Sequence, residues 1–150
     1  MTVIAWDGKT IAADKQSNYG NTKRIATKLF RANDCIIGFA GNVAIGQEVV
    51  DWFTRDGMPK DFPPQARDKE DFVSLLIAYK TGCVSEITRS PFPDSLTGKV
   101  AIGSGRDFAL AAMHLGKSAV EAVEVAALFD VNCGMGYDAY TLENQVWRKL

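Results

Sequence analysis

The sequence predicts an α+β fold in which two β-sheets pack face to face and helices cover their outer faces. Strand-like segments fall into two hairpin groups, with one helix after the first group and two helices after the second. This segregation favours a sheet sandwich, because a parallel sheet requires strands and helices in alternation. With 150 residues the chain is long enough for one domain with a real core. We therefore interpret residues 1–150 as a single domain.

The first strand group opens with a hairpin. Residues 2–6 and 10–14 are short apolar runs, and the Asp7-Gly8 pair between them is a strong hairpin signal. Residues 15–22 are polar and predict a loop or an irregular strand. Further strands are expected at residues 28–32 and 35–39.

The first helix is expected from Asn42, which can cap its N-terminus, to a stop at Gly57. Apolar residues recur along one face of this segment at helical spacing, as core packing requires. Residues 58–70 are polar and contain three prolines, so they predict a loop with at most a turn of helix.

The second strand group is a hairpin of residues 72–79 and 83–88, followed by a loop over residues 90–98. A strand over residues 99–103 leads through a Gly-Ser-Gly turn into a helix over residues 106–115, which Gly116 ends. The remaining elements are a helix that begins with the Ser118/Glu121 capping box and ends near Asp130, and strands at residues 137–142 and 146–148.

Composition excludes several classes of function. The net charge is −1 and no segment is strongly basic, so nucleic acid and anionic membranes are not expected as partners. The N-terminus does not read as a signal peptide, and no apolar stretch is long enough to span a bilayer. Three widely spaced cysteines, Cys35, Cys83 and Cys133, predict reduced thiols and a cytoplasmic location.

Thr2 is the first candidate catalytic residue. A small residue after the initiator allows removal of Met1, which would leave a threonine that carries both a hydroxyl and a free α-amine. Many ordinary proteins begin with Met-Thr, so this feature is weak alone. The turn at residues 103–105 lacks the third glycine of a dinucleotide fingerprint, and a tight strand-to-helix turn is the better interpretation. His114, as the only histidine, favours a capping or surface role.

Several segments resemble motifs of the proteasome β-subunit family, and most closely those of the peptidase subunit of the bacterial two-component ATP-dependent protease. The likeness runs from Thr2 to about Leu142, and the motifs occur in the family's order. They are Ala13–Asn21, Thr27–Phe30, Ile37–Gly41, Ala101–Gly105 and Asp130–Gly134, the last with Cys133 where the family has serine.

This resemblance implies the four-layer αββα sandwich of the N-terminal-nucleophile hydrolases, with one outer helical layer trimmed at residues 58–70. It implies that Thr2 is the nucleophile and that its own amine is the base. Lys28 would lower the pKa of both groups by its charge, and Asp14 would hold Lys28 charged and oriented.

The remaining site residues are also implied by the resemblance. The backbone N–H of Gly41 would face the oxyanion, and Ser104 with Asp130 would organise the N-terminal amine. Cys133 would be a weak hydrogen-bonding substitute for serine. The implied substrate contacts are Ser17 and Asn18, which with Gly41 would pair with an extended peptide, and Phe39 and Val43 near the specificity pocket.

The resemblance requires no cofactor, but implies a structural monovalent or divalent cation held by backbone carbonyls near Asp130 and Cys133. It implies a homo-oligomeric ring, a peptide or unfolded-protein substrate and an ATP-dependent unfoldase as partner. Two alternatives to a threonine-type endopeptidase remain open. One is a catalytically silent subunit that serves as shell or binding protein, and the other is an amidase that acts on small amides.

Overall fold

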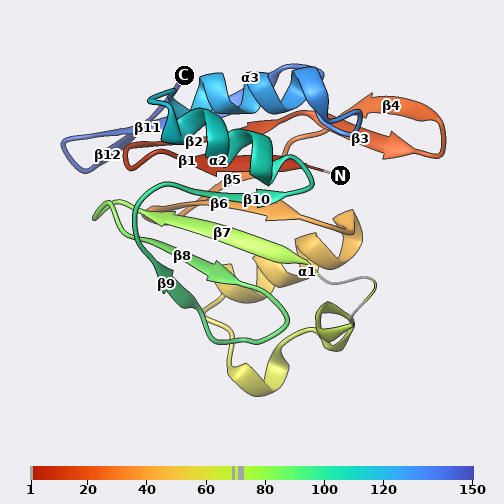
Figure 1. The fold of residues 1–150 in the computed structure, drawn as a ribbon. Coiled ribbons are helices and arrows are strands. Elements are labelled where there is room, and N and C mark those ends of the chain that lie inside the picture. Colours follow the sequence, from red (N-terminus) through yellow and green to blue (C-terminus); the bar gives the residue numbers. More distant parts are fainter. Residues whose placement is uncertain (1, 69, 71–72) are drawn as a thin grey trace.

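The computed structural model describes residues 2–68, 70 and 73–150. Two five-stranded antiparallel sheets lie face to face, and helices cover the outer face of each (Figure 1). The predicted α+β sandwich is therefore confirmed. Within the described residues, no helix is long and apolar enough to cross a membrane.

The first sheet has the strand order β10-β1-β2-β11-β12 and contains both the N-terminal and the C-terminal strands. The hairpin predicted around Asp7-Gly8 joins β1 to β2, and the Asp7 carboxylate accepts hydrogen bonds from the backbone N–H groups of Lys9 and Thr10. The strands are β1 (Val3–Trp6), β2 (Thr10–Asp14), β10 (Val100–Gly103), β11 (Tyr137–Glu143) and β12 (Val146–Lys149).

The second sheet has the order β5-β6-β7-β8-β9. Its edge strand β9 falls in the segment expected to be a loop, because three residues after Pro93 are too short a run to show strand periodicity. The expected start of β7 at Phe72 lies outside the described residues. The strands are β5 (Leu29–Ala32), β6 (Cys35–Ala40), β7 (Ser74–Tyr79), β8 (Val84–Ile87) and β9 (Asp94–Leu96).

A separate two-stranded ribbon replaces the loop or irregular strand expected over residues 15–22. It consists of β3 (Gln16–Tyr19) and β4 (Thr22–Ile25) and projects beyond the sandwich (Figure 1). All of β4 is exposed, so the ribbon lacks the alternation of apolar and polar residues that marks a half-buried strand. The Arg24 guanidinium lies 4.5 Å from the centre of the Tyr19 ring.

The helices α2 (Arg106–His114) and α3 (Ala119–Phe129) cover the first sheet. The predicted capping box is present, since Ser118 and Glu121 exchange two side-chain to backbone hydrogen bonds. Small side chains on α3 allow a close approach to the sheet. The residues buried together in this layer include Ala122 and Ala126 of α3 and Val3, Ala5 and Ala12 of the sheet.

The second sheet is covered by α1 (Val43–Thr54) and two short 3₁₀ helices, η1 (Pro59–Asp61) and η2 (Pro64–Arg67), which is the trimmed layer expected from the prolines. Asn42 caps α1 as predicted. The sequence predicted that Gly57 would end the helix as its left-handed residue. In the structure the left-handed residue after the helix is Asp56, with φ of 53°.

Gly57 follows one residue later and closes the turn by donating its N–H to the Trp52 carbonyl at 2.9 Å. The Asp56 N–H donates to the Phe53 carbonyl, which completes a Schellman motif. A Cβ at Gly57 would lie 2.3 Å from the Trp52 ring, so glycine is required there by space.

The layer between the two sheets is apolar. Ile4 and Ile11 of the first sheet pack against Ile36 and Leu76 of the second, and all four are fully buried. Trp6 and Trp147 meet edge to face with their ring centres 6.2 Å apart. This core holds together the two sheets that bear the residues around Thr2.

Candidate active site

Thr2 lies directly before β1 and is 5% exposed. Its backbone N–H donates to the Ser104 hydroxyl at 3.3 Å, and its carbonyl accepts from the Gly105 N–H at 3.2 Å. Two sequence-distant segments, the chain start and the turn at residues 103–105, are thus bonded together. Met1, whose removal is an expectation from the sequence, lies outside the described residues.

Gly103 permits this contact. Its φ is +96°, and a Cβ at this position would lie 2.1 Å from the Thr2 carbonyl oxygen. Any side chain here would therefore displace either the turn or Thr2. The Gly-Ser-Gly turn binds the chain start. This contact explains the two glycines without a role in phosphate binding.

A buried ion pair contacts Val3, the residue that follows Thr2. The Lys28 ammonium is 2.7 Å from the Asp14 carboxylate, and both side chains are buried. The same carboxylate accepts backbone N–H groups from Val3 at 3.0 Å, Gln16 at 3.2 Å and Gly134 at 3.0 Å. Asp14 therefore joins β1, β2 and the loop after α3, and it orients Lys28.

Burial lowers the pKa of Lys28, because a charged ammonium loses hydration in the interior. The negative charge of Asp14 and its hydrogen bond act in the opposite direction. Through Asp14, which also accepts the Val3 N–H, this lysine is connected to the residue that follows Thr2. It can also exchange a proton more readily than a solvated lysine.

Ser104, Cys133 and Asp130 form a chain of polar groups that reaches the Thr2 nitrogen through Ser104. The Ser104 hydroxyl is 3.9 Å from the Cys133 sulfur, which donates to the Asp130 carboxylate at 3.3 Å. Partial burial acts to raise the pKa of Asp130, but donors from Asn132, Ser104 and Cys133 outweigh it and lower the pKa overall. These donors hold an anion at the C-terminus of α3, the end that the helix dipole disfavours.

Cys133 is a protonated thiol in this arrangement. Burial, the nearby Asp14 charge and the hydrogen bond to Asp130 raise its pKa to about 12. It therefore acts as a hydrogen-bond donor and carries no thiolate character near neutral pH.

A cavity of about 640 Å³ opens beside Thr2 at the end of the sandwich. Gly41, with φ of +122°, follows β6 and contributes to its wall together with Ser104. The structure thus brings Thr2, Gly41 and Ser104 to one cavity. The hydrogen bonds above connect Cys133 and Asp130 to Ser104, and Asp14 and Lys28 to Val3. The roles of these residues remain predictions.

The residues expected to contact the substrate lie on several different elements. Ser17 and Asn18 lie on the β3–β4 ribbon, where the Asn18 amide donates to Asn132. Val43 is the exposed first residue of α1. Phe39 lies in the core beneath α1, stacked on Phe30 at 5.8 Å, instead of at a pocket surface. The alternation of β6 explains this, since Ala40 faces the other sheet and Phe39 faces the helix.

Several residues of the cavity wall were not anticipated from the sequence. Gln16 was also missed, although its amide joins Asn18 to the Val131 carbonyl. For Ser74 and Glu86 the available signal was a polar residue at an inward-facing strand position. The unanticipated wall residues are Glu70, Ser74, Glu86, Thr88 and Arg106.

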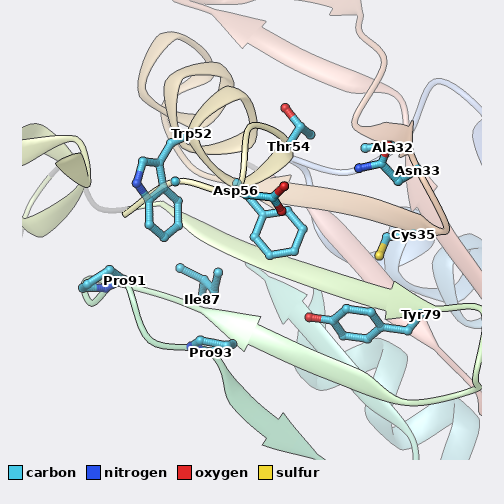
Figure 2. Close-up of a pocket in the computed structure, with 12 residues that line it drawn as sticks. Ala32, Asn33, Cys35, Trp52, Thr54, Asp56, Tyr79, Ile87, Pro91 and Pro93 are labelled. Atoms are coloured by element: carbon cyan, nitrogen blue, oxygen red, sulfur yellow. The ribbon is translucent and has the colours of Figure 1, made fainter. Parts of the chain in front are cut away.

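A second cavity of about 440 Å³ lies on the outer face of the other sheet, beside the C-terminal end of α1 (Figure 2). Trp52 and Asp56 lie on its helix side, while Cys35, Tyr79 and Ile87 come from the sheet. Burial and the Asp34 charge raise the pKa of Cys35, so this thiol is a poor nucleophile. This second cavity therefore offers no activated cysteine among its described wall residues.

No cluster of three or more metal-ligating side chains occurs among the residues that the structure describes. The cation expected near Asp130 and Cys133 would bind backbone carbonyls, which this observation does not address. That cation remains a prediction from the resemblance.

Comparison with known proteins finds similar solved structures. No family model matches the chain, and no curated protein matches it in sequence. Eukaryotic HslV from Trypanosoma brucei is similar with a TM-score of 0.72 and 27% identity, over 95% of this chain and 99% of that one. Thiobacillus denitrificans BPH has a TM-score of 0.71 and 20% identity, over 95% and 97%. Its complex with epoxomicin gives 0.70 and 19%, over 95% and 97%.

Proposed function

We propose that this chain, which has the proteasome-like N-terminal-nucleophile hydrolase fold, is a threonine-type endopeptidase whose nucleophile is Thr2 after removal of Met1. The observation that carries the proposal is the position of the Thr2 nitrogen. It lies 3.3 Å from the Ser104 hydroxyl, at a cavity that Gly41 and Ser104 also line. The likeness to HslV, a peptidase, supports the same class of activity.

In the proposed reaction the Thr2 hydroxyl attacks the substrate carbonyl and the α-amine takes the hydroxyl proton, through a water molecule. An α-amine has a pKa of about 7.7–8.0, which makes it an effective base near neutral pH. The amine then protonates the leaving amine, and an acyl-enzyme forms. Water hydrolyses this ester by the reverse proton path and restores Thr2.

The buried Lys28 favours deprotonation of both Thr2 groups by its positive charge. Asp14 keeps that charge in place at 2.7 Å. Since Asp14 also accepts the Val3 N–H, the ion pair is tied to the residue that follows the nucleophile. In this proposal the charge of Lys28 lowers the pKa of the Thr2 groups, and Asp14 contributes by holding Lys28 in position.

The N–H of Gly41 is proposed as the oxyanion donor, and loss of such a donor costs about 100- to 1000-fold in rate. Ser104 accepts from the Thr2 nitrogen and so orients the amine lone pair. Asp130 and Cys133 position Ser104 in turn, with Cys133 in the place of a hydroxyl. A cation on carbonyls near Asp130 and Cys133 would brace the same loop.

Peptides or unfolded proteins are the proposed substrates. They would pair with Ser17, Asn18 and Gly41 as an extended strand. By analogy with HslV, we propose a homo-oligomeric ring in the cytoplasm that works with an ATP-dependent unfoldase.

The test begins with the intact mass of the purified protein, which reports whether Thr2 is the first residue. Fluorogenic peptides then measure kcat/KM for wild type and for Thr2→Ala, with Thr54→Ala at the C-terminal end of α1 as a matched control. We expect turnover that Thr2→Ala abolishes and Thr54→Ala retains. Adduct formation with epoxomicin, the ligand of the similar BPH, gives a second readout at residue 2.

The same experiment distinguishes the two alternatives. A silent shell subunit would retain Met1 or show no turnover and no adduct. A small-amide amidase would cleave acylated small molecules and leave peptides intact. Unchanged peptide turnover in Thr2→Ala would exclude Thr2 as the nucleophile.

A further inference from the structure

The wall of the Thr2 cavity contains a polar patch in an otherwise apolar layer. Strands β7 and β8 direct alternate residues toward the first sheet, and most of these belong to the apolar core between the sheets. At the cavity end this pattern breaks, because Ser74, Glu86 and Thr88 line the cavity. The change coincides with the place where Thr2 meets the cavity.

The strand register places Glu86 on the inner face. Glu86 lies opposite Leu76, and Leu76 packs in the core between the sheets. Ile87, the next residue, is opposite Leu75 and packs on the other side of the sheet with the α1 layer. The carboxylate is therefore directed into the space between the sheets.

This position is costly for a carboxylate. Partial burial is the largest influence on Glu86 and raises its pKa; the nearby Asp94 charge acts in the same direction. The hydrogen bond with Ser74 and the charge of Arg106 act against it. An apolar residue here would extend the core, so the acid serves something other than packing.

The surrounding charges leave the patch acidic. Glu70 is a second carboxylate in the wall, and Asp94 lies opposite Glu86 on β9. The single basic wall residue, Arg106, donates to the Gly103 carbonyl at 3.4 Å and lies 3.7 Å from Asp107. A cationic group that enters the cavity would thus meet Glu86 at the inner wall and Glu70 at an exposed part of the wall.

We infer that this cavity accepts a lysine or arginine side chain of the substrate, with Glu86 as its partner and Glu70 as a second attraction. The inference rests on the proposed peptidase function, because it names which substrate side chain lies beside Thr2. A volume of about 640 Å³ is sufficient for a long basic side chain. Pairing with that cation would compensate the carboxylate for its lost hydration.

The first experiment digests an unfolded protein and a peptide library with protein whose N-terminus is Thr2, and maps the cut sites by mass spectrometry. We expect lysine and arginine to be enriched at one fixed position relative to the cleaved bond. Two matched peptides, with lysine or norleucine at that position, then measure selectivity as a ratio of kcat/KM values.

Glu86→Gln should lower the lysine-to-norleucine ratio by about 10- to 100-fold, the range expected for loss of a charged hydrogen-bonding partner. Glu86→Lys should shift the preference toward glutamate at the same position. Glu124→Gln, an exposed residue of α3, is the matched control and should keep the wild-type ratio.

The outcomes separate this inference from the proposed function. Thr2-dependent cleavage without a basic preference, or with an unchanged ratio in Glu86→Gln, overturns the inference and leaves the peptidase standing. Absence of any Thr2-dependent cleavage overturns the peptidase proposal and the inference with it.

Discussion

At the residue scale, the site depends on a few side chains with several partners each. The Asp14 carboxylate receives three backbone N–H groups and the Lys28 ammonium in the interior. A buried pair of this kind adds little net stability, because desolvation offsets the attraction between the charges. Removing one member is far more damaging, since the other is left charged and buried.

Lys28→Met should therefore lower the free energy of unfolding by about 3–5 kcal/mol and abolish peptide turnover. Lys15→Met is the matched control, because Lys15 pairs with Asp138 at 3.4 Å near the surface. That substitution should cost at most about 1 kcal/mol. Urea unfolding measures both values, and equal losses for the two variants would contradict a special role for the buried pair.

The cysteines should differ in reactivity. Alkylation requires the thiolate, which Cys133 forms only near pH 12 because burial and two carboxylates raise its pKa. Cys83 is exposed, so it should react with iodoacetamide at pH 8 while Cys133 in the folded protein does not. Peptide mapping by mass spectrometry measures both sites, with the urea-unfolded protein as control. Rapid modification of Cys133 in the native state would count against its role as a donor to Asp130.

At the element scale, the sequence predicted those features that local chemistry specifies. The Asp7-Gly8 hairpin, the Asn42 cap and the Ser118/Glu121 capping box each depend on residues a few positions apart, and all three are present. The β3–β4 ribbon and the edge strand β9 were not predicted. Their residues are mostly exposed, so no apolar pattern records the pairing.

Gly103→Ala tests the element that joins the chain start to β10. The new Cβ would lie 2.1 Å from the Thr2 carbonyl oxygen in a backbone with φ of +96°. Gly98→Ala is the matched control, because its φ is +75° but its surroundings are open. The control should lose about 1–3 kcal/mol through backbone strain alone.

Gly103→Ala should lose more stability than that, and its kcat should fall because Thr2 is displaced. Thermal unfolding and kcat/KM measured on both variants separate the effect of the steric contact with Thr2 from the effect of backbone strain. Equal stability and full activity in Gly103→Ala would show that the turn does not position Thr2.

At the scale of the whole molecule, the site arises from contacts that no sequence pattern contains. The resemblance supplied Thr2, Asp14, Lys28 and Ser104. Thr2 and Ser104 line one cavity, and the Asp14–Lys28 pair is connected to the neighbouring Val3 by a hydrogen bond. Glu86 was missed, because its inward direction follows only from its pairing with Leu76 across β7 and β8. Phe39 was expected near the specificity pocket, and in the structure it is a core residue that packs with α1.

The helical layer over the first sheet leaves large apolar side chains exposed. Phe108 and Phe129 stack at 5.6 Å at the surface, and Phe129 is 65% exposed. The neighbouring Leu128 and Val131 are exposed as well. Exposed apolar surface of this kind is typical of protein interfaces, and the proposed ring requires one.

Phe129→Asp should therefore disrupt assembly, because a charge within an apolar interface loses hydration without gaining a partner. Sedimentation velocity should show wild type as a large oligomer and the variant as smaller species. Phe92→Asp is the matched control, since Phe92 is equally exposed in the loop before β9 and should leave assembly unchanged. A monomeric wild type would contradict the ring itself, whereas an assembled Phe129→Asp protein would place the interface on another face.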